Sequence, residues 1–261
     1  MSVNQEAVPG NQPALQAEFK LARFVIIAGH FDYFGGAERQ AVLLAKELIH
    51  RYGAHVQFLG WGGNGVFADE IRAVGGIPRI FDLDPGQRGW RQKIKLLRLA
   101  SFVRKELKPD YLLPYVGTHC KIIGSIWKWT GAKFTWWNQR DEGRLILGTK
   151  IEHHLLKTLP ALVSNSFEGR DFLVQKFGLS PNRVRVINNG VEIPGTCDRT
   201  PWRTKLGLKD DEILFTMLAN LTQYKDHATL LKAFATVRKT EIGRRCQLIF
   251  AGQYGDTTQM L

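Results

Sequence analysis

The sequence has few cysteines and no long apolar run, and both shortages narrow what the chain can be. Its three cysteines, Cys120, Cys197 and Cys246, are far apart, odd in number and outside any C-x-x-C or Cys/His ligand spacing. This argues against a disulfide framework and a structural metal, and favours reduced thiols in the cytoplasm. The apolar stretches, such as 24–28 and 111–116, are strand-sized, far below the roughly 20 residues that cross a bilayer as a helix. We therefore expect a chain that is soluble or peripheral to a membrane.

Acidic residues are also scarce, with 24 Asp and Glu against 36 Lys and Arg, which leaves a net charge of +12. Such a charge favours anionic partners: nucleotide diphosphates, acidic lipid head groups or nucleic acid. Nucleic acid is the least favoured of the three, because the basic residues are spread out and no RNA- or DNA-binding motif is present. The stretch 1–20 lacks the basic-then-apolar order of a signal peptide and is expected to be a disordered tail.

What the chain does contain is a regular alternation of short β-like runs with helical patterns. Such alternation predicts an α/β fold, a parallel sheet with helices on both faces. The ligand crevice of this kind of sheet lies at the carboxyl ends of its strands. The strand-like runs of the larger, first part are 24–28, 56–59, 79–81, 111–114, 134–136, 162–164 and 184–187.

A glycine turn, Gly35-Gly36, stands between the first of these strands and an apolar-periodic helix that Gly53 is placed to stop. Glycines let backbone amides come close to a ligand, and the helix that follows presents free N–H groups and the positive end of its dipole. The turn therefore predicts a phosphate site. A tight strand-to-helix connection in any parallel α/β domain would look the same.

Later segments follow this turn in a defined order. Ser164-Asn165-Ser166 precedes a helix, 186–191 reads Val-Ile-Asn-Asn-Gly-Val, and Lys225-Asp226-His227 precedes a helix containing Leu230, Leu231 and Phe234. The ordered set, over about 21–252, resembles the family-4 retaining glycosyltransferases of the two-Rossmann-domain (GT-B) type. The resemblance implies transfer of a sugar, with retention, from a nucleotide-sugar donor to a glycan or lipid-linked acceptor in surface polysaccharide or glycolipid biosynthesis. It implies no cofactor and no metal.

The same resemblance divides the chain. After the tail 1–20 we expect an acceptor-side Rossmann-like domain over 21–191, a linker over 192–209 that is rich in Pro, Gly, Thr and charge, and a donor-side Rossmann-like domain over 210–261. The last domain carries only a strand, a helix and a strand, so we expect it to be incomplete.

In the resembling family a donor diphosphate faces the first-domain glycine turn and basic residues of the second domain. This implies donor contacts from Gly35, Gly36 and Lys225; the alternative for Lys225 is a solvated lysine before a helix that Asp226 caps. Where the family usually has an arginine in a G-R-L triplet, this chain has Asn220, which can bind a phosphate without contributing charge.

The family's Glu-x7-Glu pair, which orients the donor sugar and ribose, has no counterpart. The acidic residues after Lys225 are Asp226, Glu241 and Asp256. We therefore expect a fragment that is inactive alone. The rival reading is a non-catalytic module, derived from a truncated transferase, that binds a glycan, a membrane or a partner protein.

Acceptor handling is expected from side chains that follow predicted strands: His30, and the catalytic candidates His119, Arg140 and Asp141. A histidine can position or relay a proton at neutral pH, although an ordinary hydrogen-bonding role is open for both histidines. Arg140 and Asp141 could equally form a local ion pair. Trp136-Trp137 is either an apolar wall for a sugar or lipid or part of the core.

The stretch 88–108 carries eight Arg or Lys residues and one Glu, with Trp90, Leu96 and Leu99 among those on its apolar side. A basic amphipathic helix of this kind can lie on an anionic membrane, with Arg91, Lys95 and Arg98 on the lipid side. Alternatively its apolar face packs on the sheet while its charges are solvated, and both can hold. We expect a cytoplasmic protein with peripheral contact at the inner face of the cell membrane.

Overall fold

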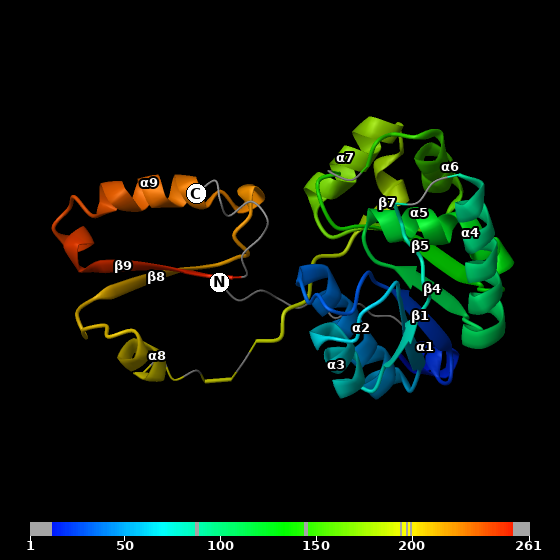
Figure 1. Ribbon diagram of the computed structural model, residues 1–261, viewed down its shortest axis with the longest axis horizontal. Helices are drawn as coiled ribbons and strands as arrows, with labels where there is room; N and C mark the ends of the chain where they lie inside the picture. Colours follow the sequence, from blue (N-terminus) through cyan, green and yellow to red (C-terminus); the bar gives the residue numbers. More distant parts are fainter. Residues whose placement is uncertain are drawn as a thin grey trace. The chain divides into compact units, whose positions relative to one another are not determined.

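The protein is described by a computed structural model that covers residues 12–86, 89–143, 146–193, 195–196, 198 and 200–252. Cys197 and Arg88 lie outside these residues. The chain divides into two compact units, Met1–Val191 and Glu192–Leu261, and each is described by itself (Figure 1).

Seven strands of the first unit form one parallel sheet in the order β3-β2-β1-β4-β5-β6-β7. At its centre Phe24 pairs with Val56 on one side and Tyr111 on the other. The strands are β1 (Arg23–Ile27), β2 (His55–Gly60), β3 (Ile77–Ile80), β4 (Tyr111–Pro114), β5 (Phe134–Gln139), β6 (Ala161–Ser164) and β7 (Val184–Val186). The predicted α/β class is confirmed, and all seven expected strands are present.

Helices cover both faces of this sheet (Figure 1). Phe24 and Ile26 of β1 point into a core with α2, while Val25 and Ile27 point into a second core with α4 and α5, because successive side chains of a strand alternate between its faces. The helices are α1 (Gln12–Phe19), α2 (Gly36–Tyr52), α3 (Val66–Ala73), α4 (Trp90–Phe102) with the π-turn η1 (Val103–Leu107), α5 (Gly117–Ile126), α6 (Lys150–Thr158) and α7 (Phe167–Phe177), with short 3-10 turns η2 (Trp127–Trp129) and η3 (Pro181–Arg183).

The helix ends follow local chemistry that the sequence displays. Gly53 ends α2 in the left-handed conformation, at φ 67°, which glycine adopts without steric cost. Ser166 begins α7 by accepting a hydrogen bond from the Gly169 N–H at 3.1 Å, the usual role of an N-terminal serine. Both boundaries agree with the sequence-based expectation.

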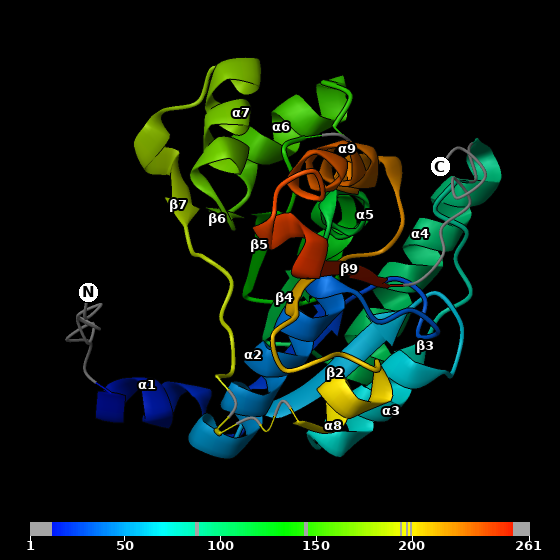
Figure 2. The ribbon, with the colours of Figure 1, turned by 90° about the vertical axis from the view of Figure 1, so that its left-hand side faces the viewer.

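The expected disorder of 1–20 does not hold for residues 12–19, which form α1 beside the end of α2 (Figure 2). The Phe19 ring packs edge-on against Phe24 and Tyr111, with centroids 5.4 and 5.6 Å away. The Tyr111 hydroxyl donates to Glu18 at 2.8 Å. These contacts cover the first residues of β1 and β4, which explains why this polar segment is ordered.

The second unit contains two parallel strands, β8 (Ile213–Leu218) and β9 (Cys246–Ala251), joined through helix α9 (His227–Val237). This is the predicted strand, helix and strand. The stretch 192–209, expected to be a linker, also holds a short helix, α8 (Thr200–Lys205), and two further turns are η4 (Gln223–Lys225) and η5 (Ile242–Arg245).

Candidate functional site

The first unit has a switch point between β1 and β4. These strands are neighbours in the sheet, yet the helix after β1, α2, packs on one face and the helix after β4, α5, packs on the other. The two connections diverge at the carboxyl ends of the strands, and an open α/β sheet binds its ligands in the crevice that results. The sequence-predicted residues of the first unit lie at this edge.

The glycine turn forms one side of the crevice. Gly35 is extended, at φ −105° and ψ −164°, and the first bond of α2 runs from the Arg39 N–H to the Gly35 oxygen at 3.0 Å. The N–H groups of Gly36 and Ala37 therefore precede the hydrogen-bonded part of the helix. Apart from its chain neighbours and the nearby backbone of α2 itself, no heavy atom of the described residues lies within 4 Å of the point where a Cβ of Gly36 would stand. The helix start is open to a ligand.

A carboxylate already sits at this helix start. Glu38 accepts a hydrogen bond from the Gly35 N–H at 3.1 Å, the reciprocal half of a capping box. An incoming phosphate would compete with Glu38 for that N–H and would be repelled by its charge. An anion must therefore use the Gly36 and Ala37 amides first, or displace Glu38.

The loops after β1 and β2 are bonded to each other above the sheet. The Phe31 N–H donates to the Gly62 oxygen at 2.9 Å, and the Trp61 N–H donates to the Gly29 oxygen at 3.2 Å. His30 pairs with Gly62 as an isolated bridge and its side chain is exposed. The structure thus places His30 on the rim of the crevice.

His119 lies on the first turn of α5, close to the carboxyl end of β4, and is 8% exposed. Its Nδ1 contacts the Tyr115 carbonyl oxygen, so Nδ1 carries the proton and donates. Burial lowers the pKa of His119, and the bond to Tyr115 opposes that effect in part. The ring is a neutral imidazole whose Nε2 is an acceptor. A Cβ on Gly29 would lie 3.6 Å from Nε2, so this nitrogen faces the loop after β1.

Arg140 follows β5 and supplies a cation. Its guanidinium lies over the Tyr115 ring, 5.4 Å from the centroid, and donates to Asn189 Oδ1 at 2.8 Å. Burial lowers the pKa of Arg140, whereas Tyr115 and Glu38 raise it, and a guanidinium stays charged at neutral pH. Tyr115 thus contacts both residues: its carbonyl oxygen contacts His119 and its ring lies under the Arg140 guanidinium. Burial raises the pKa of the Tyr115 hydroxyl to about 12.

Asp141 does not join this group. Its Oδ1 accepts from the Gln139 amide at 2.8 Å and from the Gly143 N–H at 2.7 Å. Gly143 is in the left-handed region, at φ 92°, and the carboxylate closes this turn. Arg140 and Asp141 do not form the suggested ion pair with each other, since each side chain binds the separate partners given above.

The segment before the second unit is tied to α2. The Gln40 side chain donates to the Gly190 oxygen at 2.7 Å and accepts from the Gly190 N–H at 2.9 Å. The neighbouring Asn189 is held by Arg140. The Val-Ile-Asn-Asn-Gly-Val stretch is therefore fixed at Asn189 and Gly190 to the same two elements that carry the glycine turn and Arg140.

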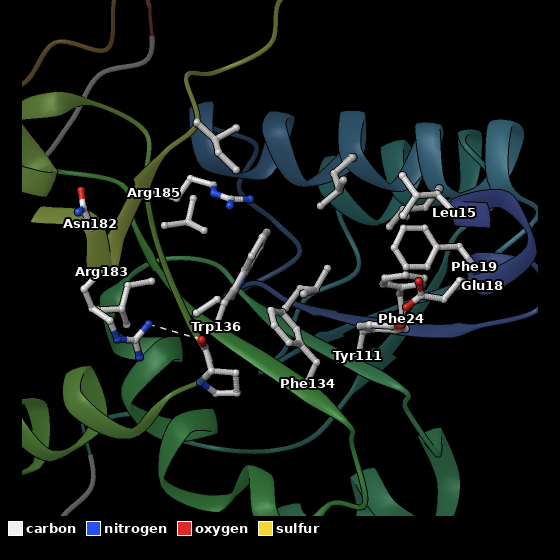
Figure 3. Close-up of a pocket in the computed structure, with 18 residues that line it drawn as sticks. Leu15, Glu18, Phe19, Phe24, Tyr111, Phe134, Trp136, Asn182, Arg183 and Arg185 are labelled. Carbon is white, nitrogen blue, oxygen red and sulfur yellow. Dashed lines mark hydrogen bonds between the residues drawn. The ribbon is translucent and has the colours of Figure 1, made fainter. Parts of the chain in front are cut away.

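The two consecutive tryptophans separate. Trp137 is fully buried and donates to Gln139 at 3.0 Å, so it belongs to the core, as one of the two readings expected. Trp136 donates to the Pro114 oxygen at 3.0 Å and lines an apolar groove on the α2 side of the sheet (Figure 3). Arg183 and Arg185 lie at one end of this groove and α1 at the other (Figure 3).

Asn220 and Lys225 occupy one loop of the second unit, between β8 and α9. The Lys225 side chain is exposed, and Asp226 begins α9 by accepting from the Thr229 N–H at 3.2 Å, which matches the alternative given for Lys225. A Cβ on Gly252 would lie 2.9 Å from the Asn220 Cα, so a glycine is needed where the ends of β8 and β9 meet. The donor-binding roles of Asn220 and Lys225 stay predictions.

Three features of the site were not foreseen: Glu38, Tyr115 and Val116. A glycine cap with Glu three positions into a helix is a capping signal, and it could have identified Glu38. Val116, between β4 and α5, has φ 70° and ψ 146°, a conformation that is essentially reserved for glycine. Nothing in the local sequence indicates it.

The described part of the chain has no helix long and apolar enough to span a bilayer. It also has no group of three or more His, Cys, Asp or Glu side chains arranged to hold a metal ion. The absence of a cofactor stays a prediction.

An open parallel sheet with a glycine turn at its switch point defines a Rossmann-like domain, and solved glycosyltransferases share this fold. HepE of Anabaena, in a crystal structure with UDP and glucose, superposes with a TM-score of 0.68 at 14% identity, covering 92% of this chain and 63% of HepE. The lipopolysaccharide outer core galactosyltransferase WaaB superposes with a TM-score of 0.56 at 13% identity, covering 87% of this chain and 68% of WaaB.

The sequence gives the family. A model of Glycosyltransferase Family 4 matches residues 34–193, and the chain belongs to this family. A D-inositol 3-phosphate glycosyltransferase of Rhodococcus jostii (strain RHA1) is 34% identical over 88 residues, which cover 32% of this chain and 19% of that protein. The chain thus spans less than two thirds of both HepE and this relative. The predicted family and GT-B fold class are confirmed.

Proposed function

We propose that the protein transfers a sugar from a nucleotide-sugar donor to a glycan or lipid-linked acceptor with retention, and that its first unit supplies the acceptor side. The observation that carries the proposal is the open start of α2 at the switch point, where, apart from chain neighbours and the nearby backbone of α2, no described atom lies within 4 Å of the Cβ position of Gly36. Membership of Glycosyltransferase Family 4 supports it. UDP-sugars are the donors to test first, because HepE was crystallised with UDP.

The chemistry follows from charge. When the donor breaks, its nucleoside diphosphate gains negative charge, and amides fixed at a helix start stabilise that charge together with a nearby cation. The Gly36 and Ala37 amides would bind the diphosphate, and the charge of Arg140 would offset that of Glu38. His119 Nε2 would accept a hydrogen bond from the acceptor hydroxyl. Asn220 and Lys225 are the donor-binding candidates of the second unit.

The setting is surface polysaccharide or glycolipid synthesis in the cytoplasm, with peripheral contact at the inner face of the membrane. WaaB, by its name a lipopolysaccharide outer core galactosyltransferase, supports the kind of product. The rival is a non-catalytic module that binds a glycan, a membrane or a partner. It is favoured by one observation, since Glu38 already satisfies the Gly35 N–H.

The variant Gly36→Val distinguishes the transferase from the non-catalytic module. The Cβ of a valine at this position would meet no neighbouring side chain, so the variant should fold. The valine would, however, occupy the space in front of the helix start where the phosphate is proposed to bind. We expect UDP binding, followed by saturation-transfer NMR at millimolar concentration, to weaken by at least about tenfold, or 1.4 kcal/mol. Gly195→Val is the matched control, because Gly195 also has no described atom other than its chain neighbours within 4 Å of its Cβ position. Equal UDP affinity in folded Gly36→Val, or no UDP binding by the wild type, would favour the rival.

A further inference from the structure

Helix α4 carries two apolar stripes, and one of them is unpartnered among the described residues. Leu99 and Ala100 are buried in the core beneath the sheet. On the outer side Trp90, Ile94 and Leu97 are 67%, 40% and 57% exposed. These three are spaced by four and three positions, which places them on one face of a helix. The single apolar side expected for this stretch is therefore divided: Leu96 and Leu99 pack toward the sheet, whereas Trp90 does not, because the buried side of α4 begins further along the helix.

Basic side chains flank the outer stripe. Arg91, Lys93 and Arg98 are exposed, and the sequence of α4 contains no acidic residue. The Arg91 guanidinium lies 5.6 Å from the centre of the Trp90 ring, so the cation and the indole form one unit. Lys95, expected on the lipid side, instead pairs with Asp82 at 3.7 Å and is held toward the body of the unit.

We propose that this outer face of α4 lies in the interface of an anionic bilayer, with Trp90, Ile94 and Leu97 inserted and Arg91, Lys93 and Arg98 at the level of the head groups. The inference specifies the peripheral contact of the proposed function and needs no transferase activity. Aromatic and aliphatic side chains bordered by long basic ones suit this boundary, since the stems of Arg and Lys lie along apolar surface while their charges reach phosphate.

Charge complementarity selects a lipid surface over a protein. Helix α4 offers cations beside the stripe and has no acidic residue of its own. The acidic Asp82, whose side chain is 97% exposed, is paired with Lys95 of this helix. The whole chain adds a net charge of +12, which attracts any anionic surface over a Debye length. A protein partner would need its own acidic rim around an apolar strip, and the test below reports that outcome separately.

The test uses the full chain and sedimentation with vesicles of phosphatidylcholine containing one quarter phosphatidylglycerol. The apolar variant Trp90→Ser/Ile94→Ser/Leu97→Ser should bind at least about tenfold more weakly, because the three apolar side chains that would insert into the bilayer are lost. The charge variant Arg91→Gln/Lys93→Gln/Arg98→Gln should lose a similar amount and much of its salt dependence. Trp129→Ser/Leu147→Ser is the matched control, since those side chains are 58% and 73% exposed elsewhere, and should bind as the wild type does.

Insertion has its own signal. The chain has seven tryptophans, so the contribution of Trp90 is the difference between the wild type and Trp90→Phe. That difference should show a blue shift and quenching by brominated lipid. Wild-type binding by the apolar variant would overturn the proposal, as would a wild type that ignores anionic vesicles and instead forms oligomers that the apolar variant disrupts. UDP binding should be unchanged in both α4 variants, so a failure of vesicle binding and a failure of Gly36→Val to act remain distinguishable.

Discussion

Val116 gives a stability prediction in which glycine should surpass alanine. Its backbone, at φ 70° and ψ 146°, costs on the order of 1–3 kcal/mol for a residue with a Cβ. Val116→Gly removes that cost. It also destabilises the fold by about 0.5–1 kcal/mol, because glycine raises the conformational entropy of the unfolded chain. Val116→Ala keeps the Cβ and its strain. Both variants lose the half-buried methyl groups, so this loss cancels, and the glycine variant should be the more stable by about 1–2 kcal/mol.

Urea unfolding followed by far-ultraviolet circular dichroism measures this difference in the free energy of unfolding. Val184 provides the control pair, because it is buried and ordinary in backbone, at φ −112° and ψ 111°. There the alanine variant should exceed the glycine variant by about 0.5–1 kcal/mol. The reasoning is refuted if Val116→Ala is as stable as Val116→Gly, since the backbone at this position would then carry no strain.

Two further variants test side-chain contacts within the first unit. Glu152 is fully buried and accepts from Lys121 Nζ at 3.2 Å and from the Thr149 N–H at 2.7 Å; Glu152→Gln should cost about 2–4 kcal/mol in urea unfolding, and a loss below about 0.5 would contradict the role. Burial opposes ionisation of Glu152, yet the bonds from Thr149 and Lys121 hold its pKa below the ordinary value. The ionised carboxylate therefore stabilises the fold above the ordinary pKa of a glutamate, and this stabilisation falls as the pH drops through the lower, folded-state pKa. The acid titration of the stability of Glu152→Gln should lack this contribution. Gln40→Leu removes both bonds to Gly190; hydrogen exchange of the Gly190 amide should accelerate at least about tenfold, at about 1 kcal/mol per bond, and unchanged exchange would show that the segment is held by other contacts.

Features set by neighbouring residues were the predictable ones. The seven strands followed from short apolar runs, and α2 from the glycine turn with Gly53 at its end, because these signals are local. Features that depend on distant contacts were not. The two stripes of α4 are equally apolar in sequence, so periodicity alone cannot say which one the sheet buries. Tyr115 is central because Arg140 and His119 reach it from other elements, and residues 12–19 are ordered by β1 and β4.

The Gln40 contact also has a mechanical consequence. The Gln40 side-chain amide binds both the N–H and the oxygen of Gly190, so the chain is anchored to α2 just before the first unit ends at Val191. Gln40 stands one turn into α2, whose first turn carries the glycine pair. A force applied to the chain at Gly190 therefore acts, through Gln40, on the end of α2 whose amides face the crevice.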